Sequence, residues 1–190
     1  MQPEEPCEAY TDARRRLRTK GRTILCRARR TVIRSLEVRY SYGSVSGGQM
    51  MDRAALYSFM GRHRYGVVSS ISGKGVPQSA LVGIATTPNL EIIFDTVKSS
   101  RKYSNLIARP ICSFVVGWAG EQTVQLEGVA IEPKGPDLKR YQEMYFSLWP
   151  DGPARMSWPD IAYLVVRPRW IRYSDYDQIP PVIEEIMIDD

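Results

Sequence analysis

The sequence has little of the two side chains on which many catalytic and metal sites depend. Its 190 residues include one histidine, His63, and three widely separated cysteines, Cys7, Cys26 and Cys112. A lone histidine at a predicted helix end is better suited to capping that end than to catalysis. The cysteines have neither metal-ligand spacing nor the pattern of a disulfide framework, which is typical of a reducing compartment. We therefore expect no metal site and a cytoplasmic protein.

Long apolar runs are also missing. No stretch approaches the ~18 consecutive apolar residues of a membrane-spanning helix, and the first residues lack the apolar core of a secretory signal. The chain does have enough apolar side chains, 43% of the total, to fill the core of one domain. These features predict one globular domain that does not associate with a membrane.

Positive charge is concentrated at the start of the chain. Residues 1–50 contain 11 Lys and Arg against 5 Asp and Glu, whereas residues 51–190 contain 15 against 16. The first fifty residues fit a nucleic-acid-binding arm, an acid-poor transit segment, or an extension without a role. Four early acidic residues disfavour the transit segment, and the near-neutral remainder disfavours nucleic-acid binding. We expect residues 1–50 to be a disordered basic extension, 51–178 the folded domain, and 179–190 a C-terminal tail.

From residue 52 onward, alternating apolar and polar residues predict mainly strands, with helices as interruptions. Expected helices cover residues 52–63, 100–108 and 136–148, and a loop rich in Pro, Gly and Trp covers 149–159. Expected strands cover residues 65–72, 76–86, 90–96, 111–118, 122–132, 161–167 and 170–176. Short, closely spaced antiparallel strands of this kind favour a small closed barrel.

The most informative stretch runs from Ile92 to Leu106. An apolar strand leads into Asp95 and Thr96, and a polar turn then brings Ser99-Ser100-Arg101-Lys102 to the start of a helix. Serine caps a helix N-terminus, where free N–H groups carry partial positive charge. Hydroxyls, a guanidinium and an ammonium added to these N–H groups suit a phosphate dianion. The alternative is an ordinary capped surface helix with two solvated cations.

The order of these parts resembles the pyridoxine 5′-phosphate oxidase-like family of FMN-binding split β-barrels. The likeness covers about residues 52–176, and its motifs are Phe94-Asp95-Thr96, Ser99 to Lys102, Arg109-Pro110, Trp118, Glu121 and Gly128. The resemblance implies a mainly β fold with flanking helices, namely a six- to seven-stranded antiparallel split barrel. It also implies a homodimer with FMN at the interface.

The resemblance further implies which residues bind the cofactor. Arg101 and Lys102 would hold its phosphate and Ser100 would donate a hydroxyl, while the backbone of residues 79–82 would lie along the flavin ring. The full implied set is Ser79, Ala80, Leu81, Val82, Asp95, Thr96, Ser100, Arg101, Lys102, Thr123 and Gln125, with Tyr145 and Trp158 as substrate contacts. The tryptophans of residues 149–158 have the alternative role of packing against the barrel.

Three departures separate the chain from the vitamin B6 oxidases of that family. Gly83 stands where those enzymes have a lysine for the substrate phosphate, the arginine expected just after Tyr145 is missing, and residues 174–177 replace an R-L-H signature. We therefore expect a divergent FMN-dependent oxidoreductase that acts on a small molecule or an electron carrier, without pyridoxine-phosphate oxidase activity. A deazaflavin- or haem-binding barrel, and a non-enzymatic flavin-binding module for stress or storage, remain alternatives.

Overall fold

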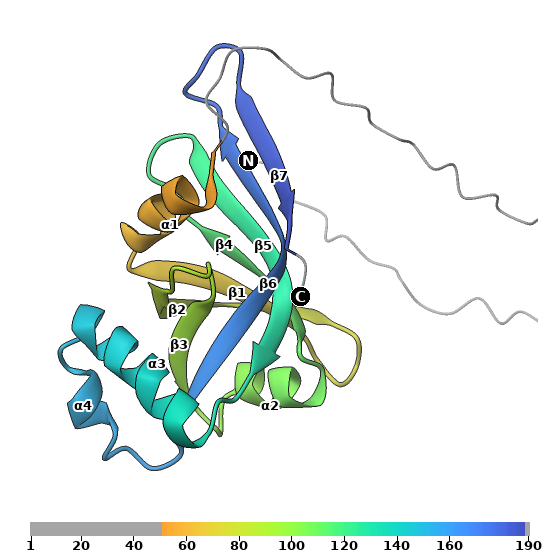
Figure 1. The fold of residues 1–190 in the computed structure, drawn as a ribbon. Helices are drawn as coiled ribbons and strands as arrows, with labels where there is room; N and C mark the ends of the chain where they lie inside the picture. Colours follow the sequence, from red (N-terminus) through yellow and green to blue (C-terminus); the bar gives the residue numbers. More distant parts are fainter. Residues whose placement is uncertain (1–50, 189–190) are drawn as a thin grey trace, which may run out of the picture. The chain divides into compact units, whose positions relative to one another are not determined.

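The structure, a computed structural model, describes residues 51–188. The expected basic extension of residues 1–50 lies outside the described residues and stays a prediction. The elements in chain order (Figure 1) are α1 (Arg53–Gly61), β1 (Tyr65–Ile71), β2 (Pro77–Thr86), β3 (Ile92–Val97), α2 (Arg101–Ala108), β4 (Ile111–Val116), β5 (Gln122–Ile131), α3 (Gly135–Leu148), α4 (Gly152–Arg155), β6 (Ile161–Asp175) and β7 (Val182–Met187).

The strands form one antiparallel sheet that closes on itself. Their order is β3-β2-β1-β4-β5-β6-β7, and an additional pairing of β3 with β6 closes six of them into a barrel. The prediction of a mainly β antiparallel barrel with flanking helices is confirmed. Among the described residues, no helix combines the length and the apolar character needed to cross a membrane.

Alternation along each strand separates the barrel core from its outer surface. In β4, Cys112, Phe114 and Val116 are buried, whereas Ile111 and Val115 are exposed on the outer face. The inward residues of the other strands join the same core cluster, together with Leu56, Phe59 and Met60 of α1. This alternation, with a period of two residues, explains why the strands could be predicted from the sequence.

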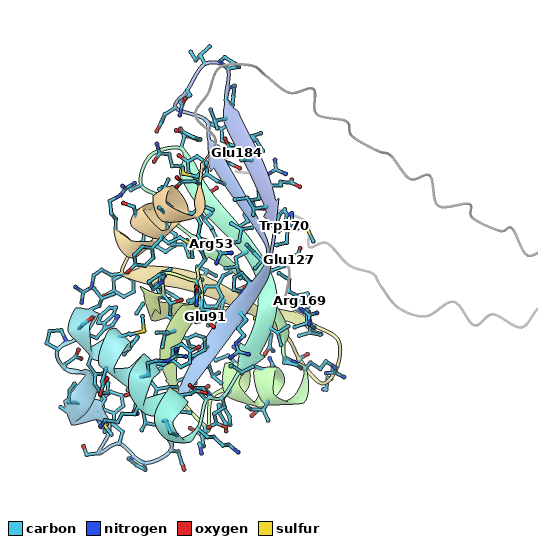
Figure 2. The ribbon with its side chains drawn as sticks, in the orientation of Figure 1. Arg53, Glu91, Glu127, Arg169, Trp170 and Glu184 are labelled. Atoms are coloured by element: carbon cyan, nitrogen blue, oxygen red, sulfur yellow. The ribbon has the colours of Figure 1, made fainter. Side chains whose placement is uncertain are left out.

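The two last predicted strands are in fact one. β6 runs without interruption from Ile161 to Asp175, through Pro168 and Arg169, which lie between the two predicted strands. Its pairing with β5 shifts register between Glu127 and Gly128, so that Trp170 lies opposite Glu127 and Arg169 is the extra residue of the bulge (Figure 2). A bulge of this kind accommodates a proline because it interrupts the ladder of backbone hydrogen bonds.

The described part of the expected C-terminal tail, residues 179–188, contains a seventh strand. β7 pairs with the second half of β6 over six residues, from Asp175 opposite Val182 to Trp170 opposite Met187. Val182 and Ile186 pack against the barrel core. The loop predicted for residues 149–159 likewise contains a short helix, α4.

Helix α3 covers the outer face of β2, β3 and β6 and forms a second apolar cluster there (Figure 1). Tyr141 and Tyr145 are fully buried against Ile93 and Val165. The Tyr141 hydroxyl donates to both carboxylate oxygens of Glu91, at 3.0 and 3.1 Å. Helix α3 ends at Leu148, and the segment that follows it, residues 149–160, forms part of the candidate site.

Candidate cofactor site

The start of α2 places the predicted phosphate-binding residues together. Ser100 is the N-cap of the helix, and its Oγ accepts the N–H of Tyr103 at 3.3 Å. The same oxygen lies 2.9 Å from the hydroxyl oxygen of Thr96 on β3. With Thr96 as the donor, the Ser100 hydroxyl is free to donate to an anion. The N–H groups of Arg101 and Lys102 open the helix, where they have no partner within it.

Asn105 fixes α2 against the β1–β2 hairpin. Its buried Nδ2 donates to Ser70 Oγ at 3.1 Å and to Gln78 Oε1 at 3.0 Å. Ser70 and Gln78 are directly opposite each other in the hairpin register. The helix start is therefore held at a defined position beside β2, as a preorganised binding site requires.

Two adjoining cavities open beside this helix start. The first encloses about 200 Å³ and is lined by Ser70, Gln78, Ser79, Ala80, Ser100, Arg101 and Lys102. The second encloses about 280 Å³ between residues 81–83 of β2, residues 95–97 of β3, Ile161, and Arg155 and Trp158 of the segment 149–160. Lys102 lines both cavities, so one ammonium group stands at their junction.

The electrostatics of the junction depend on Lys102 and Asp95. Partial burial lowers the pKa of Lys102, and the negative charge of Asp95 opposes this by raising it. A partly desolvated ammonium is costly unless an anion compensates it. The group is therefore suited to a ligand that brings more negative charge than Asp95 supplies.

Asp95 is itself held by two residues of the α3–α4 region. Tyr145 donates its hydroxyl to Asp95 Oδ1 at 3.0 Å, and Arg155 Nη1 lies 3.0 Å from Oδ2. Burial, and then the charge of Asp95, raise the pKa of Tyr145, so this phenol stays protonated. Burial alone would lower the pKa of Arg155, but Asp95 raises it. The three side chains form one charge-compensated group at the edge of the second cavity.

The structure assembles most of the predicted residues but not all. Those at residues 79–82, 95–96 and 100–102, together with Trp158, line the two cavities. Tyr145 has no exposed surface, and it contacts the site through the hydrogen bond from its hydroxyl to Asp95.

Thr123 and Gln125 lie on β5, away from the cavities. Across the sheet, Leu81 lies opposite Val67, Val67 opposite Val115, and Val115 opposite Gln125. Three strand spacings separate Leu81 from Gln125, or roughly 14 Å.

Three polar residues that line the cavities, Ser70, Gln78 and Arg155, were not predicted from the sequence. Ser70 and Gln78 were detectable in principle, because the tight turn at residues 73–75 fixes their pairing in the hairpin. Arg155 had no such signal, since it reaches Asp95 from sixty residues further along the chain through a loop without regular pattern.

His63 lies away from both cavities. Its ring packs against Phe59, with centroids 4.8 Å apart, and its Nε2 is buried with no hydrogen-bond partner in the described part of the chain. Arg62 rather than His63 is the C-cap of α1, although the His63 N–H donates to Met60 at 3.1 Å. Burial, and to a lesser extent the charge of Arg62, lower the pKa of His63.

Comparison with known proteins places this arrangement in a family. Residues 53–175, well over half of the chain, match the family described as pyridoxamine 5′-phosphate oxidase. The chain belongs to this family. A search among curated proteins found no match.

Solved structures share the family fold at low sequence identity. A haem-binding protein from Mycobacterium smegmatis has a TM-score of 0.63 and 16% identity, over 75% of this chain and 60% of that one. An FMN-binding, pyridoxamine 5′-phosphate oxidase-related protein from Nostoc punctiforme has a TM-score of 0.54 and 12% identity, over 76% and 99% of the two chains. General Stress Protein 26 from Bacillus anthracis has a TM-score of 0.55 and 19% identity, over 72% and 100%. The chain thus spans only about 60% of the mycobacterial protein.

Within the family, this chain is a divergent member. Gly83 on β2 lies in close contact with Trp149. A Cβ on residue 83 would lie 2.8 Å from Cζ2 of Trp149. The Trp149 indole is fixed there by a 3.0 Å hydrogen bond from its Nε1 to the Ile84 carbonyl. Arg64 covers the ring, with its Cζ 4.4 Å from the centroid. An aromatic side chain therefore fills the space into which a longer residue 83 would project.

Proposed function

We propose that the chain binds FMN in the two adjoining cavities and acts as an FMN-dependent oxidoreductase. The observation that carries the proposal is the position of Arg101 and Lys102 at the capped start of α2, where Lys102 faces both cavities. A phosphate in the first cavity would meet two cations, the Ser100 hydroxyl and free helix N–H groups. Each of these is a donor that phosphate prefers.

The second cavity suits a flat, uncharged ring. Leu81 and Val82 supply apolar surface from β2, and Trp158, which is 53% exposed, supplies an aromatic side chain from the opposite wall. Asp95 and Arg155 compensate each other's charge at its edge. Side chains of this kind favour a polarisable ring system with polar edges over a second highly charged group.

The chemistry would be supplied by the bound flavin, which accepts and donates electrons or hydride. The residues of this chain bind and orient it: Arg101 and Lys102 hold the phosphate end, and the backbone of residues 79–82 supports the ring. Tyr145 keeps Asp95 in place through its hydroxyl. Trp158 remains the candidate contact for a small-molecule or electron-carrier substrate, since Tyr145 has no exposed surface.

We further propose a homodimer with the cofactor between two copies. The outer face of β1, β2 and β4 carries exposed apolar side chains, among them Leu81 at 61% exposure, Ile111, Val115, Tyr65 and Ile71. Several exposed apolar side chains on one sheet face are typical of a protein interface. Gln125 and Thr123 lie beyond it, too far along the sheet to reach the ring bound at Leu81 of their own copy. They would reach a ring held by the partner.

The haem alternative has less support from the residues of this chain. The sole histidine, His63, is packed against Phe59 on α1, and no residue of that type lines either cavity. Among residues 51–188, no cluster of His, Cys, Asp and Glu is arranged to hold a metal ion. The stress or storage role suggested by the Bacillus protein would use the same flavin site without turnover. A cytoplasmic location stays a prediction.

The test compares FMN with riboflavin, which has the same ring but no phosphate. Fluorescence titration of cofactor-free protein should show FMN binding at least about tenfold more tightly, because charge-assisted hydrogen bonds to phosphate contribute more than 1.4 kcal/mol. Equal affinities, or no binding of either, would contradict the site. Sedimentation of Leu81→Asp against wild type tests the dimer, which the buried charge should dissociate together with the flavin.

A further inference from the structure

Residues 149–160 form a segment that crosses from α3 to β6 and roofs the second cavity. Arg155 and Trp158 of this segment are part of the cavity wall. The segment is attached at both ends: Trp149 Nε1 donates to Ile84, and the Asp160 carbonyl accepts the Lys98 N–H at 2.8 Å. Between these ends, the ion pair of Arg155 with Asp95 connects it to β3.

Apolar packing holds the start of the segment, where Gly152 is buried against Phe146, more firmly than residues 156–158. Met156 and Trp158 are both more than half exposed. The polar contacts beneath it are incomplete, since Arg155 Nε and the Tyr163 hydroxyl are buried without a hydrogen-bond partner in the described part of the chain. Burying unpartnered polar groups opposes the closed position. The ion pair of Arg155 with Asp95 is therefore the main side-chain polar contact between the segment and β3.

That attachment is electrostatically linked to the phosphate-binding residues. Lys102 and Arg155 line the same cavity, and Asp95 lies on the wall between them. The carboxylate attracts both cations, whereas Lys102 repels Arg155. An anion bound by Arg101 and Lys102 would neutralise this repulsion and add its own attraction for Arg155. Anion binding at α2 should thus favour the closed position. Salt should screen these interactions only weakly, because the side chains of Arg155 and Asp95 are largely buried.

We propose that residues 149–160 are a lid over the second cavity, which closes when an anion binds at Arg101 and Lys102, with Arg155 and Asp95 as its latch. The proposal rests on the proposed function for the anion site and adds to it a conformational response. By linkage, the closed lid holds the anion more tightly to the same degree. The lid would then cover a cofactor ring only when the phosphate end is in place.

Hydrogen exchange measured by mass spectrometry tests the lid on the full-length, cofactor-free protein, with inorganic phosphate as the probe and chloride at equal ionic strength as the reference. In wild type, phosphate should slow exchange in α2 residues 101–104 and also in residues 149–160. The slowing in the lid should be at least about fivefold, the lower end of typical couplings between sites. In Arg155→Gln, α2 should still be protected, and the lid should not respond.

Two further variants make the outcome decisive. Arg140→Gln removes a matched arginine whose ion pair with Asp137 is exposed on α3, and should behave as wild type. The single variant Arg155→Gln leaves Asp95 buried without its counter-charge. If that variant fails to fold, the double variant Asp95→Asn/Arg155→Gln, which replaces the charged pair by two amides, takes its place. The lid proposal would be overturned if phosphate protected α2 but did not slow exchange in residues 149–160 of the wild type. It would also be overturned if exchange in residues 149–160 slowed equally in the variants that lack the Arg155–Asp95 ion pair. Absence of α2 protection would overturn the lid and the phosphate site together.

Discussion

Trp149 lies in the space that a side chain on residue 83 would occupy. The distance from an ideal Cβ at Gly83 to Trp149 Cζ2 is 2.8 Å, and two more indole carbons lie within 3.2 Å. The ring cannot easily retreat, because it stacks on Tyr145 with centroids 6.0 Å apart and donates a hydrogen bond to Ile84. Glycine at 83 and tryptophan at 149 are therefore a matched pair, because the indole occupies the space that a longer side chain at 83 would need.

This pairing predicts that Gly83→Ala destabilises the fold. Forcing a methyl group against the indole should lower the free energy of unfolding by about 1–3 kcal/mol. Urea denaturation measures the loss. Gly73→Ala is the matched control, since a Cβ there meets nothing within 4 Å. In a double-mutant cycle, Trp149→Ala should remove most of the Gly83→Ala penalty; strictly additive effects would show that the two positions do not interact.

The second prediction concerns Arg101 and Lys102. The double variant Arg101→Ala/Lys102→Ala should lose most of its FMN on purification, while the melting temperature of the cofactor-free protein changes little, because neither side chain belongs to the buried core. Flavin content per protein, measured by absorbance, reports the loss. Lys139→Ala/Arg140→Ala removes the same charge from the exposed face of α3 and should retain FMN. Full flavin content in the first variant would rule out the assigned phosphate site.

The strands were predictable because their signals are local. Alternation in β4 and β5 and the tight turn at residues 73–75 each specify structure within a few residues. The phosphate motif was visible for the same reason, since its capping serine and its two cations are consecutive in the chain.

What was missed depends on contacts between distant segments. Pro168 breaks a local pattern, yet the bulge between β5 and β6 lets β6 continue through it. The Val182–Met187 strand has adjacent glutamates instead of clean alternation, and pairing with β6 determines it. Tyr145, expected as a substrate contact, is buried and reaches the site through Asp95, a connection across fifty positions that no motif encodes.

The third prediction uses the lowered pKa of His63. The native state binds a proton at His63 less readily than the unfolded chain, in which the imidazole takes up its proton near pH 6.5. Above that pH both states are neutral and the group has no effect. As the pH falls below about 6.5, protonation of the unfolded state should lower the free energy of unfolding.

Urea denaturation between pH 8 and 5 measures this dependence, and His63→Gln should flatten it. The pKa of Asp175 is lowered mainly by its hydrogen bond from Gln178. This carboxylate therefore changes the free energy of unfolding only at lower pH, and its effect can be separated from that of His63. A slope unchanged in His63→Gln would show that another group is responsible.

The fourth prediction is that Cys112 is chemically inert in the folded protein. Burial in the barrel core raises the pKa of its thiol to about 12, which lowers the reactive thiolate fraction at pH 8 on the order of a thousandfold relative to a free cysteine. In a Cys7→Ser/Cys26→Ser variant, a disulfide reagent should label Cys112 only after urea is added. Rapid labelling without urea would mean that this part of the core opens to solvent.

The central claim, that the cavities at α2 hold FMN, is tested most directly by the absorbance spectrum of the purified protein with mass spectrometry of whatever heat releases. The account predicts the bands of an oxidised flavin and the mass of FMN, close to one per chain. A haem or deazaflavin spectrum would keep the barrel and replace the proposed chemistry. A colourless protein that takes up no added FMN would contradict the claim.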